Sequence, residues 1–187
     1  MARFNEFYKE LDLTTLHELC LSKGVERVYG RGEKFLCEGG VCRKIALIKN
    51  GYFRYSTRQT NGGEGIVGFS FAGEYLADMS NSLAGTPAPV SITAGKVSEV
   101  LEISVDDFLT MCSEDCPELL TSMMLTLFRT LYRRFTNIYR FSPKERYLEL
   151  ARLHPQLLQE VPLRDIASYL QISPIHLSRI RRELIGK

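Results

Sequence analysis

Residues 24–104 most restrict what this chain can fold into, because short apolar runs alternate there with glycine-rich turns. Runs such as IALIKNGYFRYSTR and IVGFSF are separated by segments such as TNGGEG. Such runs are typical of strands. The pairs Asn50-Gly51 and Asn61-Gly62 predict hairpins, since both central positions of the favoured turn require a positive φ. Apart from a brief helical segment at residues 73–83, no helix is expected, and the pattern predicts a small antiparallel roll or barrel.

Helical periodicity flanks this region on both sides. Residues 4–22 carry apolar side chains at helical spacing among charges, which predicts one amphipathic helix. Asp106 and Asp107 stand where the helix dipole favours negative charge, so a helix is expected to begin there. After Pro117 an uninterrupted helical pattern continues to about residue 139.

The long helix presents a near-heptad apolar stripe, which suits packing against a second copy of the chain. We therefore predict a homodimer interface there. The alternative is a helix that lies on its own roll, and both arrangements are compatible, because a second apolar edge exists beside the stripe. The stripe consists of Leu120, Met124, Leu127, Leu131, Phe135 and Ile138.

The C-terminal stretch 162–184, PLRDIASYLQISPIHLSRIRREL, predicts two short helices joined by a tight turn. Ser173 suits the N-cap of the second helix, and Pro174 suits its first position. A short second helix with a polar, basic outer face suits the major groove of DNA. The alternative is an ordinary helical hairpin with a solvated basic face. The predicted outer face consists of Ser173, Ile175, His176, Ser178, Arg179 and Arg182.

Charge is divided unevenly along the chain. Residues 129–187 hold twelve basic and five acidic residues, whereas residues 1–128 hold twelve basic and seventeen acidic ones. The basic excess coincides with the helical pair, which indicates a localised surface for a polyanion.

Several classes of protein are disfavoured by the composition. The N-terminus has no apolar run, and no segment is long enough to span a bilayer, so a cytoplasmic protein without a membrane partner is expected. The five cysteines have spacings that match no common metal motif, so buried or partly buried thiols are favoured over a metal or iron–sulfur site. Barrel enzymes that use a metal need histidines in the barrel. His17, His154 and His176 all lie outside residues 24–104, so no enzyme and no metal site are predicted.

The order of a helix, an antiparallel roll, a long helix and a basic helix-turn-helix resembles the cyclic-AMP receptor protein/FNR (Crp/Fnr) family of bacterial transcription regulators. The segments ERYLELARLHPQLLQEVPLRDIASYLQIS, GEKFLCEGGVCRKIALIKNGYFR and FAGEYL carry the likeness. It implies an α+β fold in three parts. These are a cyclic-nucleotide-binding-like jelly roll at 1–115, a dimerisation helix at 116–141 and a helix-turn-helix DNA-binding domain at 142–187, which is expected to lack a full wing.

The family's roll binds a cyclic nucleotide through a Gly-Glu pair, whose Glu takes the ribose 2′-hydroxyl, and through a later Arg that binds the phosphate. Gly73 and Glu74 match the first pair, but Ala88 and Pro89 stand in place of the second. No Arg or Lys occurs between Arg58 and Lys96, so a phosphate would lack its charge-assisted partner.

We therefore predict that cyclic AMP is not bound in the family's manner and that the effector is unknown. Two alternatives are open for the roll: it binds another small molecule, or it no longer binds a ligand. For Glu74 the alternative to a ligand contact is a structural carboxylate that holds a loop. The candidate pocket residues are Gly73, Glu74, Thr86, Ser91 and Thr93.

The resemblance implies a homodimer that binds a pseudo-palindromic site on double-stranded DNA, with RNA polymerase as a further candidate partner. Arg179 is the expected guanine reader, and Ile175 could meet a thymine methyl group. His176 and Ser178 are candidate phosphate or base contacts. The alternative is a sensor or protein-interaction module whose helix-turn-helix no longer reads DNA.

Overall fold

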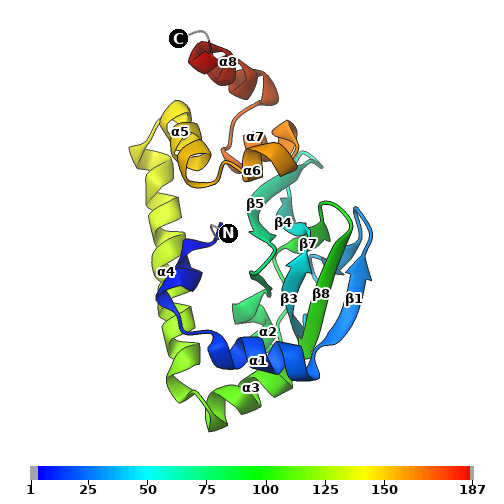
Figure 1. Cartoon of the computed structure of the whole chain (residues 1–187). Coiled ribbons are helices and arrows are strands. Elements are labelled where there is room, and N and C mark those ends of the chain that lie inside the picture. Colours follow the sequence, from blue (N-terminus) through cyan, green and yellow to red (C-terminus); the bar gives the residue numbers. More distant parts are fainter. Residues whose placement is uncertain (1–3, 186–187) are drawn as a thin grey trace.

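The computed structural model describes residues 4–185 and has the predicted α+β architecture. A β-roll occupies one side of the molecule, and the long helix α4 (Pro117–Arg140) runs along the other (Figure 1). The helices that follow α4 in the chain lie near its C-terminal end (Figure 1). In the part of the chain that is described, no helix is both long and apolar enough to cross a membrane.

The roll consists of two four-stranded sheets in which every neighbouring pair of strands is antiparallel. The first sheet has the order β1 (Val25–Tyr29), β8 (Ser98–Ser104), β3 (Lys44–Asn50) and β6 (Tyr75–Leu76). The second has the order β2 (Lys34–Leu36), β7 (Ser91–Ala94), β4 (Tyr52–Arg58) and β5 (Glu64–Phe71). The predicted antiparallel roll is therefore confirmed.

Large apolar side chains from both sheets fill the interior of the roll. Alternation along β3 and β4 turns one row of side chains inward from each strand. Burial of this apolar surface is the main driving force for the roll. The cluster is formed by Tyr29, Phe35, Leu36, Cys42, Ala46, Ile48, Phe53, Leu76, Ala88, Ile92, Ala94 and Val100.

The two predicted hairpins have different outcomes. Asn61-Gly62 lies in the loop between β4 and β5, which pair with each other, and Gly62 has a φ of +82°. The Asn50-Gly51 hairpin is wrong, because β3 and β4 belong to different sheets. Gly51, with a φ of +94°, instead turns the chain through the corner from one sheet to the other.

The single helix predicted over residues 4–22 is also wrong. The chain forms a short 3-10 helix, η1 (Glu6–Glu10), and then α1 (Thr14–Lys23). The Asp12 carboxylate accepts hydrogen bonds from the backbone N–H of Thr14 at 3.0 Å and from its hydroxyl at 2.7 Å. These bonds satisfy donors at a new helix start, which favours a break over continued helix.

Two short helices complete the body of the molecule, one within the roll and one between its last strand and α4. Of the helical segment predicted at residues 73–83, the first part is strand β6, and only α2 (Met79–Ala84) is helical. The predicted acidic helix start is α3 (Val105–Glu114), capped by the Ser104 hydroxyl, which accepts from the N–H of Asp107 at 2.9 Å. Helix α4 then follows as predicted.

A C-terminal helical unit, residues 142–185, comprises α5 (Pro143–Leu153), α6 (Leu157–Glu160), α7 (Leu163–Tyr169) and α8 (Pro174–Ile185). Ser142 and Glu145 form a capping box at the start of α5. This box satisfies two donors that would otherwise be unpaired at the helix start.

The C-terminal helical unit shares its apolar core with the roll and with the N-terminal segment. Phe4, Tyr52, Ile66 and Phe69 pack in the same cluster as residues of all four helices. A unit of this size carries little core of its own. Contact with the roll therefore supplies part of its stability. The cluster's members from the unit are Tyr147, Leu150, Leu157, Val161, Ile166, Ala167, Leu170, Leu177 and Ile180.

The corner at Gly51 gives a test of the roll. A Cβ at this position would lie 2.1 Å from Ser98 Oγ and 2.6 Å from Ser98 Cβ, on backbone that L-residues rarely adopt. We expect Gly51→Ala to lower the free energy of unfolding by about 3 kcal/mol or more, because the steric clash adds to the backbone strain. Urea denaturation measures this change.

Gly62→Ala is the matched control. Gly62 has a similar φ of +82°, but no atom lies within 4 Å of a Cβ built there. We expect this substitution to lower the free energy of unfolding by about 1–2 kcal/mol, from backbone strain alone. Equal losses in the two variants would show that the corner is not tightly packed.

Candidate nucleic-acid interface and effector roll

Helices α7 and α8 form the helix-turn-helix, and local chemistry fixes the turn between them. Gln171, in the turn, has a φ of +58°, a conformation that few residues other than glycine adopt. The Ser173 hydroxyl then accepts a hydrogen bond from the N–H of His176 at 3.1 Å. This bond makes Ser173 the predicted N-cap of α8. Leu177 and Ile180 are buried and hold the inner side of α8 against the rest of the unit.

The outer side of α8 is open to solvent. Ile175 is 69% exposed, and His176, Arg179 and Arg182 are also exposed, whereas Ser178 is half-buried. The structure thus brings the predicted outer residues onto one accessible surface.

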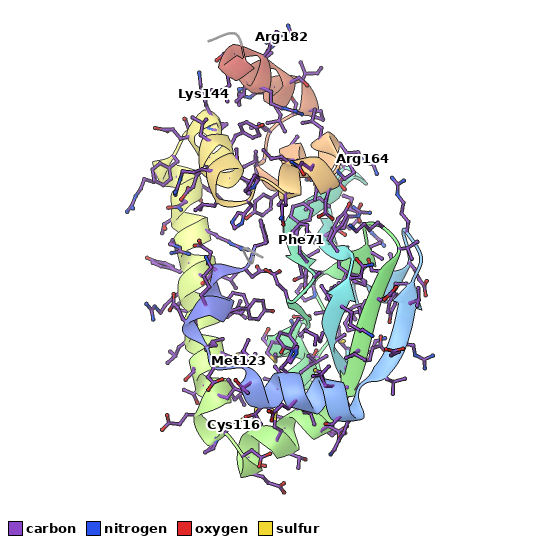
Figure 2. All side chains as sticks on the ribbon, in the orientation of Figure 1. Phe71, Cys116, Met123, Lys144, Arg164 and Arg182 are labelled. Atoms are coloured by element: carbon purple, nitrogen blue, oxygen red, sulfur yellow. The ribbon has the colours of Figure 1, made fainter. Side chains whose placement is uncertain are left out.

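Further basic residues lie near this surface and were not among the predicted site residues. Arg181 is exposed on α8, and Arg164 is exposed on α7. Lys144 of α5 forms an ion pair with Glu183 of α8 at 2.9 Å. Figure 2 shows Lys144, Arg164 and Arg182 gathered at the same end of the molecule, far from Cys116 and Met123. The net positive charge of residues 129–187 is the sequence signal that could have indicated them.

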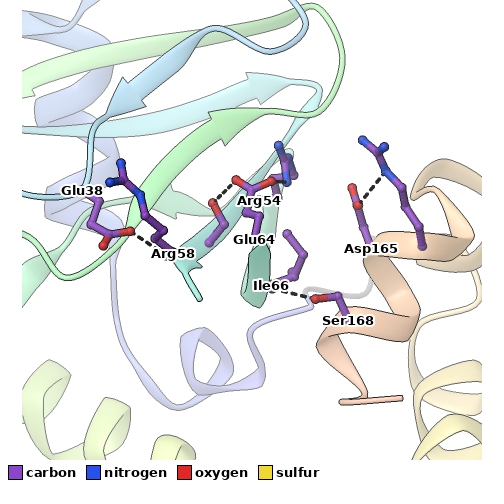
Figure 3. A network of polar contacts seen from close by, with 9 residues as sticks. Glu38, Arg54, Arg58, Glu64, Ile66, Asp165 and Ser168 are labelled. Carbon is purple, nitrogen blue, oxygen red and sulfur yellow. Dashed lines mark hydrogen bonds and ion pairs between the residues drawn. The ribbon is translucent and has the colours of Figure 1, made fainter. Parts of the chain in front are cut away.

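Helix α7 is fastened to the exposed edge of the roll. Strand β5 is the last strand of its sheet, and its Ile66 N–H donates to Ser168 Oγ of α7 at 2.9 Å (Figure 3). On the same helix Asp165 is buried and pairs with Arg164 at 3.3 Å. Covering the edge strand in this way satisfies a donor that would otherwise be unpaired.

The predicted effector residues differ in their surroundings. Glu74 is fully buried, and its two carboxylate oxygens accept from the backbone N–H and the side-chain amide of Asn5, each at 2.7 Å. Burial raises the pKa of Glu74, and the donors from Asn5 and from the Phe71 N–H oppose this shift. Gly73, with a φ of +84°, makes the turn before Glu74.

The three predicted hydroxyl residues come from two segments: Thr86 follows α2, whereas Ser91 and Thr93 share one face of β7. Thr86 is exposed and donates to Asn81 Oδ1 at 3.0 Å. Ser91 accepts from the N–H of Glu38 at 3.0 Å, and the buried hydroxyl of Thr93 has no hydrogen-bond partner among the described residues. Ala88, one of the residues in place of the family's phosphate-binding pair, is itself part of the apolar core.

Two cavities lie outside the roll, next to the C-terminal helical unit. The larger, of about 420 Å³, lies between the C-terminal half of α4, strand β5 and helices α5 and α7. The smaller, of about 290 Å³, lies beside α6. Phe4 and His154 line both.

The long helix uses two faces. Its buried residues are Leu119, Met123, Thr126 and Thr130. Leu120, Met124 and Leu127, from the predicted dimer stripe, are half-buried against the chain's own core. The other residues of the predicted stripe are exposed. Further apolar residues of α4, which were not part of the stripe, are exposed beside them. These exposed apolar residues are Leu125, Phe128, Leu131, Tyr132, Phe135, Ile138 and Tyr139.

The cysteines provide no metal centre in the described residues, where no group of three or more potential metal ligands occurs. All five thiols are free. Burial raises the pKa of Cys20 and of Cys112 to about 11, so both are neutral thiols at neutral pH. Cys37 is exposed, contrary to the prediction of buried thiols, because it lies in the loop after β2.

Comparison with known proteins agrees with this architecture. The family model of the cyclic nucleotide-binding domain matches residues 26–115. Residues 26–115 are therefore similar to a cyclic nucleotide-binding domain. No curated protein matches the sequence.

Solved structures extend the likeness from the cyclic nucleotide-binding domain to the whole chain. FixK2 from Bradyrhizobium japonicum has a TM-score of 0.74 at 18% identity, over 87% of this chain and 85% of that one. The c-di-GMP responsive global regulator CLP of Xanthomonas campestris has a TM-score of 0.67 at 15% identity, over 94% and 92%. The catabolite activator protein of Thermus thermophilus has a TM-score of 0.59 at 20% identity, over 96% and 86%. The predicted resemblance to the Crp/Fnr regulators is confirmed, and the chain has their fold.

In the matched region, the segment that the resemblance assigns to anion binding carries no cation of its own. The segment that follows Gly73 and Glu74 offers the hydroxyls of Thr86 and Ser91 but no cationic side chain. Burial raises the pKa of Glu74, and the positive charge that opposes this shift is that of Arg134, which lies on α4. A cyclic phosphate bound along this segment would therefore find no charged partner in the segment itself. The nearby cation comes from another part of the roll, because the guanidinium of Arg43 lies 3.3 Å from the position of a Cβ at Gly85.

His154 predicts a pH dependence of stability. Burial against Phe4, whose ring lies 4.9 Å away, lowers the pKa of His154, and Arg134 and Lys9 also lower it, whereas Glu6 raises it. The unfolded chain therefore binds a proton more readily than the folded chain. The free energy of unfolding should fall as the pH drops through about 6.5, the ordinary histidine value.

Urea denaturation between pH 7.5 and 5.5 measures this change. His154→Gln should remove most of the slope in that interval. His17→Gln, at an exposed position of α1, is the matched control and should keep the slope. A wild-type stability that stays constant over this interval would contradict the inferred burial.

Proposed function

We propose that this protein is a homodimeric DNA-binding transcription regulator of the Crp/Fnr type. The observation that carries the proposal is the exposed outer side of α8, where Arg179 and Arg182 stand clear of the core on a helix whose inner side is anchored by Leu177 and Ile180. A guanidinium at such a position can donate two parallel hydrogen bonds to O6 and N7 of guanine. The surrounding arginines supply contacts to phosphates.

The homodimer is supported by the exposed apolar row on α4. Leu125, Phe128, Tyr132, Phe135 and Tyr139 follow one another at alternating spacings of three and four residues, as in a coiled-coil seam. A row of exposed aromatic residues on one helix marks an interface. We therefore assign the dimer contact to this seam and not to the first half of the predicted stripe, which packs on the chain's own core. Leu131 and Ile138, from the second half of the stripe, flank the seam.

A two-fold dimer would present two copies of α8 to DNA. The half-sites would then lie about 34 Å, one helical turn, apart on a pseudo-palindrome. Binding should weaken steeply with salt, because each phosphate that is neutralised releases counterions. A cytoplasmic location and a contact with RNA polymerase remain predictions.

For the roll, we propose that cyclic AMP is not bound in the family's manner. The support is the missing cation in the segment after Glu74 and the use of both Glu74 oxygens by Asn5. The effector remains unknown, with Gly73, Thr86, Ser91 and Thr93 as candidate contacts. Titration calorimetry with cyclic AMP should show no binding at micromolar concentrations.

A second candidate function is a sensor or protein-interaction module whose helix-turn-helix does not read DNA. Ile175 favours it, because this exposed side chain cannot hydrogen-bond a base edge. An apolar contact with a thymine methyl group accounts for the same residue in a DNA-binding protein. Fluorescence anisotropy with DNA separates the two functions.

The role of Arg179 can be tested by substitution. Arg179→Ala should weaken binding to a selected DNA site by about 1–3 kcal/mol and relax the preference at one base pair of each half-site. Fluorescence anisotropy against the selected site and its single-base variants measures both effects.

Arg27→Ala is the charge-matched control, since Arg27 is exposed on β1, away from the C-terminal helical unit. It should leave affinity and preference unchanged. If Arg179→Ala weakens all sequences equally, Arg179 contacts a phosphate and the base-reading role is wrong.

The seam on α4 can be tested in the same way. Phe128→Glu should raise the dimer dissociation constant by about 100-fold or more, because it places an unpaired charge in an apolar interface. Sedimentation velocity measures the change. Val28→Glu, at a 65% exposed position on β1, is the matched control and should remain dimeric. A Phe128→Glu variant that stays dimeric would exclude this seam.

A further inference from the structure

The N-terminal residues Phe4 and Asn5 lie where the roll, α4 and the C-terminal helical unit meet. Both are buried, with 4% and 7% of their surface exposed. In Figure 1 the start of the chain, coloured blue, runs beside α4 on the side that faces the roll. This position allows two residues to contact all three parts of the molecule.

Asn5 connects the roll to the long helix through directed hydrogen bonds. Its backbone N–H and side-chain amide donate to the two oxygens of Glu74, each at 2.7 Å, and the amide also donates to the carbonyl of Phe69 at 2.9 Å. Its side-chain oxygen accepts from Arg134 Nη2 of α4 at 3.1 Å. Each polar group of the Asn5 side chain is therefore paired, and two of its partners are charged.

Phe4 connects the roll to the C-terminal helical unit. Its ring centroid lies 5.8 Å from that of Phe69 on β5, 4.9 Å from that of His154 and 5.9 Å from that of Tyr169 on α7. The guanidinium of Arg134 lies over the same ring at 5.2 Å from its centroid. Arg134 thus contacts both residues of the pair.

Glu74 depends on this pair. The carboxylate is fully buried, and besides Asn5 its other hydrogen-bond donor is the N–H of Phe71, at 3.1 Å. No side-chain cation pairs with it directly among the described residues; Arg134 reaches it through Asn5. Departure of Asn5 would leave a buried carboxylate with most of its hydrogen-bonding capacity unsatisfied, which is costly. Asn5 is therefore the main hydrogen-bonding partner of the buried carboxylate.

We propose that Glu74 and Arg134 form a binding site whose occupant is the chain's own Phe4–Asn5 pair, an intramolecular peptide ligand that holds the C-terminal helical unit against the roll. Its consequence for regulation rests on the proposed function, since it assigns the unit a DNA-binding role. Any effector that binds Glu74 must displace Asn5 and with it Phe4. By linkage, effector binding and release of the unit from β5 then favour each other.

Hydrogen exchange on the full-length protein, without DNA, tests this proposal. The Ile66 N–H is protected by Ser168 Oγ only while α7 is docked on β5. Asn5→Ala should speed exchange at Ile66 and through α7 by about tenfold or more, because it removes charge-assisted bonds of the site. Exchange in β3, at the centre of the roll, should not change.

Two further variants make the test selective. Arg134→Gln removes the charge that contacts both Phe4 and Asn5 and should give the same selective increase. Arg133→Ala is the matched control: its neighbouring guanidinium pairs with Glu6 at 3.2 Å on the surface, and its loss should leave exchange at Ile66 unchanged.

Two outcomes would overturn the proposal. One is unchanged exchange at Ile66 in Asn5→Ala. The other is an equal increase in β3 and α7 in both the Asn5 and the Arg134 variants, which would make the pair an ordinary part of the roll's core. Because no DNA is present, failure of this test leaves DNA binding untouched, and absence of DNA binding leaves this test interpretable.

Discussion

One shared apolar cluster holds the C-terminal helical unit to the rest of the molecule, and the arrangement of the candidate site depends on it. The unit is too small to bury a sufficient core alone. Its helices therefore pack together with Tyr52, Ile66 and Phe69 of the roll and with Phe4. Because the same cluster takes Leu177 and Ile180 from the inner side of α8, it also determines which side of that helix remains exposed. The basic outer surface is thus a consequence of how the unit is anchored.

The long helix α4 also has one side that packs on the molecule and one side that is exposed. One face packs against α3 and the N-terminal segment, and its ion pairs to that segment include Arg133 with Glu6 and Arg129 with Glu10. The opposite face carries exposed aromatic residues, among them the stacked pair Phe128 and Tyr132. A helix with this division can join its own roll to a second chain. The roll also contacts the C-terminal helical unit directly, through β5 and α7.

Sequence patterns predicted the elements better than their partners. Alternating residues and glycine turns indicated the roll, and helical spacing indicated α4 and α8 correctly. The corner at Gly51 was taken for a hairpin, because a local turn signal does not say whether the two strands share a sheet. The predicted dimer stripe overlaps only in part with the exposed side of α4, because the side that packs on the chain's own body includes Thr126 and Thr130, which a search for apolar residues omits.

The candidate site shows the same limit. Residues on the outer side of α8 could be predicted, since a single helix fixes them by its own period. Asn5 could not, because its contacts with Glu74 and Arg134 join positions 69 and 129 residues away in the chain. An asparagine in a charged N-terminal segment carries no local sign of such a role. Only the folded arrangement shows that the carboxylate expected to meet an effector is already bound by the chain itself.

Selection of binding sites from a pool of random duplexes, followed by sequencing of the retained DNA, tests the central proposal most directly. The account predicts enrichment of a pseudo-palindrome with half-sites about one helical turn apart, and two chains on each duplex. Affinity for that site should fall steeply as salt rises. No enrichment over the starting pool at low salt, with the full-length protein folded and dimeric, would contradict it.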